Sequence, residues 1–241
     1  MTRTALVTGA AKGIGHAVVE RLLADGADVI AVDRAEVDRS PFLLAPGQRL
    51  DTVRADLAEL SSLDVLAQAV EDTGNRLDTI VHAAGVLVRR PSIDEVTEAD
   101  FDLQYAVNLK AAFFLVVRLR HLVRDGGSIV LFSSQGWWTG GLGGSLPYAT
   151  TKAGVVALTR SLARELAPRL RVNAIAPGFV DTDMMHEGLD PDRRAELVAQ
   201  VPLGRMASPR EIADAAVMLT LPDAAYLTGI TLNATGGQLS Y

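Results

Sequence analysis

A glycine-rich turn between a short apolar run and a helical pattern limits the fold of this chain more than any other feature. Residues 4–8 (TALVT) are typical of a strand, GAAKGIG follows, and the next residues (AVVERLLADG) have helical spacing. Because Gly9, Gly13 and Gly15 carry no side chains, backbone N–H groups and the amino end of the helix can approach a pyrophosphate. Their spacing is G-x-x-x-G-x-G, not the commoner G-x-G-x-x-G. Such a turn can also be purely structural, so a second feature is needed.

That second feature is a carboxylate at the end of the next expected strand. Residues 27–32 (ADVIAV) are mainly apolar and lead to Asp33, eighteen residues after Gly15. A carboxylate near this offset can bind the ribose hydroxyls of an adenosine, so we predict a dinucleotide site. The charge of Asp33 would repel a 2′-phosphate, which favours NAD over NADP. The cations Lys12 and Arg34 could favour the phosphate, but a solvated surface role is expected for both.

Strand-like and helix-like segments alternate along the rest of the chain. Further strands are expected at 50–57, 77–85, 127–134, 171–178 and 229–237, and helices at 61–70, 97–124, 145–167 and 208–221. Residues 34–49 contain two prolines and no clean period, so we expect a loop there. This alternation predicts one doubly wound α/β sheet of about seven parallel strands. With no linker or repeat, residues 1–241 are expected to form a single domain, with a flap at about 180–205.

Composition excludes several classes of function. The formal net charge is −6 and no basic run occurs, so nucleic acid is not an expected partner. The chain has no cysteine, which excludes thiolate chemistry and cysteine-type zinc sites, and we expect no metal. No signal-like segment or apolar run of membrane-spanning length is present, so a soluble cytoplasmic protein without membrane partners is expected.

The predicted helix at 145–167 carries a tyrosine and a lysine four residues apart. Tyr148 and Lys152 would therefore lie on one face, about one turn apart. A nearby ammonium lowers the pKa of a phenol, which lets it exchange protons with a substrate oxygen. The spacing alone is common on helix surfaces, and only the rest of the chain gives it weight.

Together these segments resemble the short-chain dehydrogenase/reductase family, over nearly all 241 residues. The matching pieces are Thr8-Gly9, Lys12-Gly13-Ile14-Gly15, Asp33, Asp56-Leu57, Ala83-Ala84-Gly85, Asn108, Ser133-Ser134, Tyr148, Lys152, Pro177-Gly178 and Thr182. The resemblance implies a three-layer Rossmann-like sheet with helices on both faces. It also implies nicotinamide-dependent interconversion of alcohols and carbonyl compounds, with Asn108, Ser134, Tyr148 and Lys152 as catalytic residues.

Each of these four residues has an expected role. Tyr148 is the general acid in reduction and the general base in oxidation. Ser134 positions the substrate oxygen against Tyr148. By resemblance, Lys152 also binds the nicotinamide ribose and Asn108 holds a water in a proton relay. The expected cofactor contacts are Gly9, Lys12, Gly13, Ile14, Gly15, Asp33, Asp56, Leu57, Ala83, Ala84, Gly85, Tyr148, Lys152, Pro177, Gly178, Val180 and Thr182.

The chain departs from the family pattern near the substrate. Ser134 precedes Tyr148 by fourteen residues, where family members usually have thirteen, and His82 stands where asparagine is usual. A structural role is expected for His82. The expected substrate contacts are Ser134, Gln135, Trp137, Trp138, Tyr148 and Met184, which suggest a small or cyclic, mainly apolar secondary alcohol or ketone. His186 or Arg205 could meet an anionic group, although a solvated role is favoured for both.

Three functions remain open from the sequence. The first is an NAD-dependent alcohol dehydrogenase. The second is an NADP-dependent 3-oxoacyl-carrier-protein reductase, which would predict a basic patch at the pocket mouth and which Asp33 opposes. The third is a dinucleotide-binding regulator without turnover, which the Tyr148–Lys152 pair opposes. Small residues Ala149, Ala153 and Ala157 recur at four-residue spacing, and with the resemblance they suggest a homotetramer.

Overall fold

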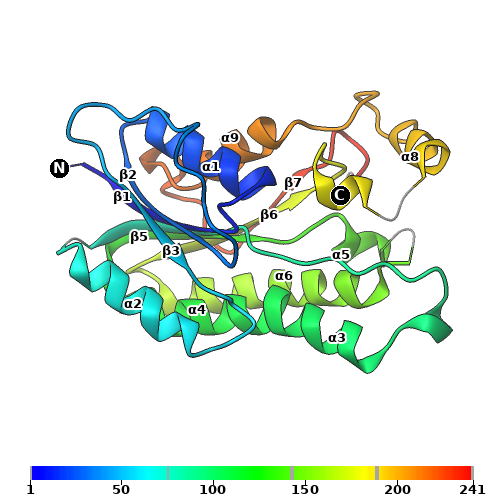
Figure 1. Cartoon of the computed structure of the whole chain (residues 1–241), viewed down its shortest axis with the longest axis horizontal. Helices are drawn as coiled ribbons and strands as arrows, with labels where there is room; N and C mark the ends of the chain where they lie inside the picture. The colour runs from blue at the N-terminus through cyan, green and yellow to red at the C-terminus, as the bar shows by residue number, and fades with distance from the viewer. Residues whose placement is uncertain (1, 75, 142–143, 188–189, 240–241) are drawn as a thin grey trace.

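The computed structural model describes residues 2–74, 76–141, 144–187 and 190–239, and its centre is a seven-stranded parallel sheet. The strand order is β3-β2-β1-β4-β5-β6-β7, which confirms the predicted doubly wound fold (Figure 1). The strands are β1 (Thr4–Thr8), β2 (Asp28–Asp33), β3 (Leu50–Arg54), β4 (Leu77–His82), β5 (Val123–Phe132), β6 (Arg171–Pro177) and β7 (Thr231–Ala234). From β1 the chain adds strands first on one side (β2, β3) and then on the other (β4 to β7). Ligands bind in such sheets at the point where the strand order reverses, which here lies between β1 and β4.

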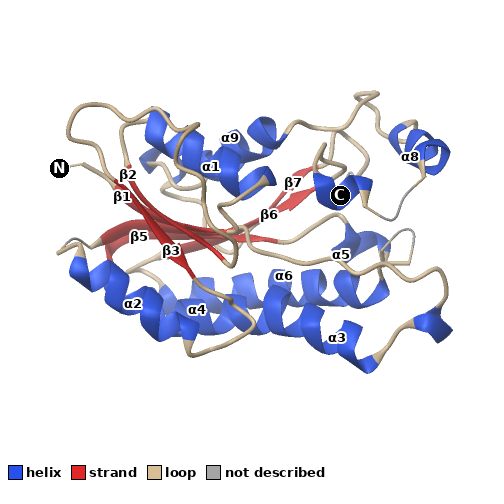
Figure 2. Cartoon of the chain, viewed as in Figure 1, coloured by secondary structure: helices blue, strands red, loops and turns tan. Residues whose placement is uncertain are grey.

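Helices cover both faces of this sheet (Figure 2). One face carries α1 (Gly13–Ala24) and α9 (Pro209–Met218), and the other carries α2 (Ser62–Asp72), α4 (Ala111–Leu119) and α6 (Leu146–Leu166). The remaining helices are α3 (Glu98–Tyr105), α5 (Gly136–Thr139), α7 (Asp183–His186) and α8 (Pro191–Val198). The sheet is thus the middle of three layers. No helix in the described ranges is long and apolar enough to cross a membrane.

Several element boundaries differ from the sequence-based expectation. β3 ends at Arg54 and β4 at His82, earlier than expected, whereas β5 begins at Val123 instead of residue 127. The early start of β5 depends on Gly126, whose φ of +81° permits an irregular register with β4. The expected helix at 97–124 is interrupted by a π-helical turn at 106–110 and ends in a 3₁₀ turn at 120–122.

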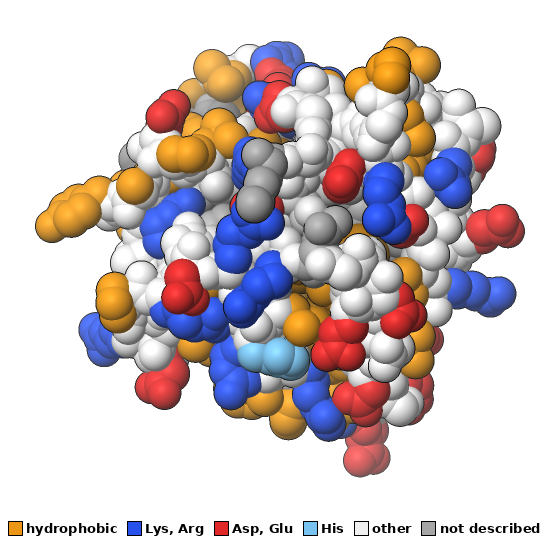
Figure 3. All heavy atoms as spheres, turned by 90° about the vertical axis from the view of Figure 1, so that its left-hand side faces the viewer, with side chains coloured by type: hydrophobic (Ala, Val, Ile, Leu, Met, Phe, Trp, Pro, Cys, Tyr) orange, Lys and Arg blue, Asp and Glu red, His pale blue; other side chains and the backbone are white. Residues whose placement is uncertain are grey.

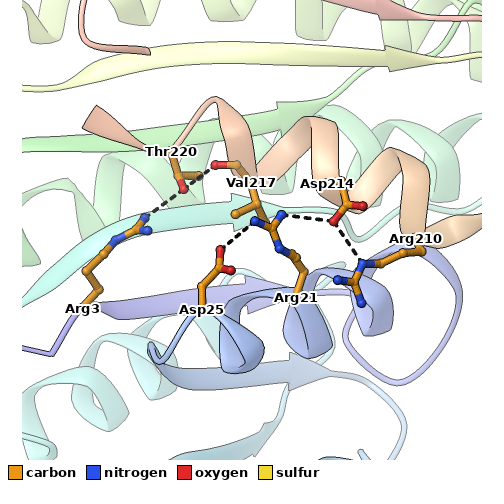
Figure 4. A network of polar contacts seen from close by, with 7 residues as sticks. All are labelled: Arg3, Arg21, Asp25, Arg210, Asp214, Val217 and Thr220. Atoms are coloured by element: carbon orange, nitrogen blue, oxygen red, sulfur yellow. Dashed lines mark hydrogen bonds and ion pairs between the residues drawn. The ribbon is translucent and has the colours of Figure 1, made fainter. Parts of the chain in front are cut away.

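Polar contacts join the two helices on the first face (Figure 4). Arg21 of α1 pairs with Asp25 at 3.1 Å and with Asp214 of α9 at 3.1 Å. Arg210 donates to the same Asp214 carboxylate at 3.0 Å. Of these pairs only that between Arg21 and Asp214 links α1, the helix that follows the glycine turn, to α9.

Basic side chains gather at the amino edge of the sheet, on the left of Figure 1 and facing the viewer in Figure 3. Near the start of β5, Arg76 and Arg169 both donate to the carbonyl of Val123, at 3.3 and 3.0 Å. Arg169 also donates to the carbonyl of Arg120 at 2.7 Å. These arginines donate to backbone carbonyls in the segment that leads from α4 into β5. They lie at the edge of the sheet opposite to the carboxyl ends of the strands.

Candidate active site

The glycine turn after β1 has room for a ligand and none for side chains. Gly9 and Gly13 have φ of +74° and +60°, a region that favours glycine. A Cβ on Gly15 would lie 2.0 Å from the carbonyl oxygen of Gly9, and one on Gly9 would lie 2.8 Å from the nitrogen of Ala84. Helix α1 begins directly at Gly13, and its N-cap residue Lys12 makes no side-chain capping bond. Free N–H groups at this helix start fit the pyrophosphate of a dinucleotide.

Asp33 lies at the end of β2, beside this turn. Its Oδ2 accepts from the N–H of Ala11 at 3.0 Å, and its Oδ1 accepts from the N–H of Ala35 at 3.0 Å. The carboxylate is therefore held at the position expected for an adenosine ribose. Lys12 is largely exposed and pairs with Asp183 at 3.1 Å, which links the turn to α7.

A cavity of about 160 Å³ opens at the carboxyl ends of β4, β5 and β6. It brings together many residues that the sequence predicts for the cofactor and the substrate. These are Ile14, Ala83, Gly85, Ser134, Gln135, Tyr148, Lys152, Pro177, Gly178, Val180, Thr182 and Met184. Its other walls include apolar side chains such as Leu87, Phe132, Phe179 and Met185. The cavity lies between the expected cofactor site and the segment that carries α7.

Tyr148 and Ser134 meet inside this cavity. The Ser134 hydroxyl hydrogen-bonds the hydroxyl of Tyr148 and also accepts from the N–H of Gly136 at 3.2 Å. Burial raises the pKa of Tyr148 above its ordinary value, while the bond from Ser134 and the positive charge of Arg89 act in the opposite direction. The sequence-based expectation was a lowered pKa, and it is wrong for this geometry because burial outweighs the nearby donors.

Lys152 lies one turn beyond Tyr148 on α6, as its spacing predicts. Its ammonium is 5.4 Å from the centroid of the Tyr148 ring and donates to the carbonyl of Phe132 at 2.8 Å. Burial lowers the pKa of Lys152 to about 8. The hydroxyl of Ser133 donates to the Lys152 carbonyl at 2.9 Å, which fastens α6 to the end of β5.

Asn108 is buried in the π-helical turn and holds the chain that leaves β4. Its Oδ1 accepts from the N–H of Val86 at 2.8 Å, and its Nδ2 donates to the carbonyl of Val86 at 2.9 Å. Nδ2 also donates to the hydroxyl of Thr151 at 3.2 Å. A Cβ on Gly85 would lie 3.3 Å from Asn108 Oδ1 and 3.4 Å from Lys152 Nζ, so this glycine lets both approach the strand end.

His82, the departure at the end of β4, is buried outside the cavity lining. Its Nδ1 lies 2.8 Å from the hydroxyl of Thr8 on the neighbouring strand, while its Nε2 is buried with no partner among the described residues. Burial, and next the charge of Lys152, lower the pKa of His82 to about 3. The ring is therefore neutral near pH 7, and its place in the sheet fits the expected structural role.

The structure corrects the expectation for the paired tryptophans. Neither Trp137 nor Trp138 lines the cavity, and Trp138 is 58% exposed. In the single helical turn of α5, Gly136 and Thr139, together with Gln135 just before it, line the cavity, whereas Trp137 is partly buried outside that lining. The two indoles instead stack edge to face at 5.5 Å.

A second cation in the cavity wall, besides Lys152, is Arg89, which sequence reasoning missed. Its Nη1 donates to the carbonyl of Met184 at 2.9 Å and to that of Glu187. The two candidates named from the sequence are engaged elsewhere. His186 bonds Asp181 at 2.7 Å, and Arg205 pairs with Glu211 on α9 at 2.7 Å. Arg89 follows Gly85 by only four residues, which is the one signal that could have marked it.

The strand order and the glycine turn are those of a dinucleotide-binding α/β protein. The cavity that holds Ser134, Tyr148 and Lys152 beside this turn is typical of an oxidoreductase active site. A family model described as enoyl-(acyl carrier protein) reductase matches residues 9–238. The chain is 37% identical to the 3-oxoacyl-[acyl-carrier-protein] reductase FabG of Vibrio cholerae, over 98% of this chain and 97% of that protein. The chain belongs to the short-chain dehydrogenase/reductase family.

Solved structures agree with this assignment. A short-chain dehydrogenase/reductase from Brucella melitensis superposes with a TM-score of 0.91 at 32% identity, covering 99% of this chain and 97% of that one. A blue fluorescent protein from a metagenomic library, solved in complex with NADPH, has a TM-score of 0.88 at 33% identity and covers 99% and 98%. The protein is thus an NAD(P)-dependent oxidoreductase acting on CH–OH groups, as predicted.

Proposed function

We propose that this protein interconverts a small or cyclic secondary alcohol and its ketone, with NAD(H) as the cofactor. The observation that carries the proposal is the meeting of Ser134, Tyr148 and Lys152 in one cavity beside the glycine turn. When bound, the nicotinamide accepts or supplies the hydride. The chain itself must hold the substrate oxygen and move one proton, and these three side chains are suited to both tasks.

Tyr148 and Ser134 act on the substrate oxygen. The Ser134 hydroxyl holds that oxygen against the phenol, and Tyr148 gives its proton in reduction or takes one in oxidation. A raised pKa keeps Tyr148 protonated at neutral pH, which suits the reductive direction. Lys152 holds a positive charge beside the ring, and Lys152 and Tyr148 would together bind the nicotinamide ribose.

Asn108 acts as a positioning residue in this scheme. Its side-chain amide bonds both the N–H and the carbonyl of Val86. These bonds hold the preceding residue, Gly85, next to Lys152. The water relay implied by the family resemblance stays a prediction. The segment at about 180–205 would close over the cavity within one domain of residues 1–241.

NAD is the proposed cofactor because of Asp33. Two backbone N–H groups hold its carboxylate at the end of β2, where the adenosine ribose would lie. A fixed negative charge there accepts hydrogen bonds from ribose hydroxyls and repels a 2′-phosphate. Lys12, which could have favoured the phosphate, pairs with Asp183.

The second candidate is the NADP-dependent reduction of a 3-oxoacyl group on an acyl carrier protein. It is favoured by the similarity to the Vibrio cholerae enzyme of that name. Asp33 opposes it, and so does the placement of Arg76 and Arg169 at the edge of the sheet away from the cavity. A regulator without turnover is the third candidate, opposed by the assembled Tyr148–Ser134 pair.

We also infer a homotetramer built on the outer helix layer. Phe101 and Phe113, on α3 and α4, are each 41% exposed, and Ala157 is exposed on α6. These apolar side chains would be buried by a second copy of this layer. Light scattering at assay concentration tests the inference, and a monomer would contradict it.

The experiment that tests the proposed function is a panel of alcohols and ketones followed by nicotinamide absorbance with both cofactors. Cyclic secondary alcohols should be oxidised with NAD⁺, with kcat/KM at least tenfold above that with NADP⁺. Preferential reduction of acetoacetyl thioesters with NADPH would support the second candidate. Turnover of no member of the panel by pure protein would favour the regulator.

A further inference from the structure

Besides Lys152, the wall of the cavity contains a second positive charge, that of Arg89. Arg90 pairs with Asp100 at 2.7 Å, and Arg205 pairs with Glu211 at 2.7 Å. Arg89, half-buried at the cavity, forms no direct ion pair with any residue in the described part of the chain, and the charge of Glu187 acts on it without such a pair. A partly buried cation without a counter-ion is unfavourable, because desolvation is not repaid by an opposite charge.

The hydrogen bonds of Arg89 leave part of its guanidinium unused. Both described bonds, to the carbonyls of Met184 and Glu187, come from Nη1. Its Nε is buried with no partner in the ranges that the structure describes, an arrangement that folded proteins normally avoid. The Nη1 bonds hold the side chain in the cavity wall and leave Nη2 without a bond in the described ranges.

We infer that Arg89 binds an anionic group of the substrate, and that the substrate is a small hydroxy or oxo acid. The inference rests on the proposed function. A guanidinium binds a carboxylate through charge-assisted N–H bonds, and Nη2 of Arg89 carries no hydrogen bond among the described residues. A carboxylate would supply both the counter-charge and the acceptor that Arg89 lacks.

The rest of the cavity sets the shape of that acid. Arg89 and Tyr148 line the same cavity of about 160 Å³, so a small molecule could present a carboxylate to one and its reacting oxygen to the other. Leu87, Phe132 and Met185 give the same cavity apolar walls. A carbon ring with a hydroxyl and a carboxylate as separate substituents combines these features.

The test compares matched acids and esters. We would measure kcat/KM for 3-hydroxycyclohexanecarboxylate, its methyl ester and cyclohexanol with NAD⁺ in wild type, Arg89→Gln, Arg89→Lys and the control Arg90→Gln. Wild type should prefer the acid over the ester at least tenfold, and Arg89→Gln should remove this preference. Arg90→Gln removes the neighbouring guanidinium, which pairs with Asp100 and does not line the cavity, so the preference should persist there. A ratio within one variant is unaffected by loss of folded protein.

A binding measurement separates this inference from the proposed function. Calorimetry with cyclohexanecarboxylate, which has no reacting hydroxyl, should show binding to wild type and to Arg90→Gln and at least tenfold weaker binding to Arg89→Gln. An equal acid-to-ester ratio in wild type and Arg89→Gln, or equal or absent binding in calorimetry, would overturn the role of Arg89. If cyclohexanol is oxidised while the acid has no advantage, the proposed function stands and the anion site is refuted. If nothing is oxidised, calorimetry alone decides.

Discussion

The backbone N–H of Ala11 donates to Oδ2 of Asp33 at 3.0 Å, so the carboxylate expected to select the cofactor also fastens the glycine turn after β1. This double role complicates a simple substitution at the site. Asparagine can keep one acceptor for Ala11 while it removes the charge, whereas alanine removes both. The two variants therefore separate cofactor selection from support of the turn.

For Asp33→Asn we expect the ratio of kcat/KM with NADP⁺ to that with NAD⁺ to rise at least tenfold, with little change in Tm. Asp33→Ala should show the same shift and also lose the bonds to Ala11 and Ala35. That loss should cost about 1–2 kcal/mol and lower Tm by roughly 2–8 °C. Steady-state assays with both cofactors and thermal unfolding measure the effects. A wild-type preference for NADP⁺ would contradict the argument from ribose binding.

Tyr148→Phe should remove the proton donor together with only one of the many expected cofactor contacts. We expect kcat to fall by about 10²–10⁴-fold, the usual contribution of general acid–base catalysis. The affinity for NADH should stay within a few-fold, because the ring and Lys152 remain on α6. Fluorescence titration with NADH is the control for folding and binding. Turnover within tenfold of wild type would exclude Tyr148 from the proton-transfer role.

The spacing of residues within single segments made much of the site predictable. Gly15, Tyr148 and Lys152 owe their positions to a turn or a helix whose geometry follows from local sequence, and the structure places them as expected. Arg89 was not predictable in this way, since its place depends on where the chain after β4 meets α7. The inward or outward direction of Trp138 likewise depends on the start of a one-turn helix, which no periodicity reveals.

The direction of the pKa shift of Tyr148 is a second property that local sequence does not predict. A neighbouring lysine in the sequence predicts a lowered pKa, but burial, which depends on the whole assembled cavity, raises it. The early start of β5 is a third case. It depends on pairing with β4, a contact between segments more than 40 residues apart, as in the pair Leu77 and Val123.

The charge of Arg89 should affect the pH dependence of alcohol oxidation through the pKa of Tyr148. Oxidation needs the phenolate of Tyr148, so kcat/KM should rise with pH towards a pKa that burial has raised. Arg89 opposes that rise in pKa, and Arg89→Gln should therefore move the ascending limb to higher pH. Profiles with cyclohexanol, which lacks a carboxylate, isolate this effect from substrate binding. In Arg90→Gln the limb should stay in place, and an unmoved limb in Arg89→Gln would contradict the coupling.

His82→Asn should make the protein less sensitive to acid. The pKa of His82 is about 3 when folded, against 6.5 ordinarily, so between these values only the unfolded chain binds the proton. The free energy of unfolding therefore falls as pH drops below about 6.5, by up to about 1.4 kcal/mol per pH unit from this group. Asparagine does not titrate, and other acid-sensitive groups are common to both proteins. We would measure the free energy of unfolding in urea at pH 7.5, 6.5, 5.5 and 4.5. As pH falls, this free energy should decrease less in the variant than in wild type. An equal decrease in both proteins would mean that His82 is protonated in the folded protein.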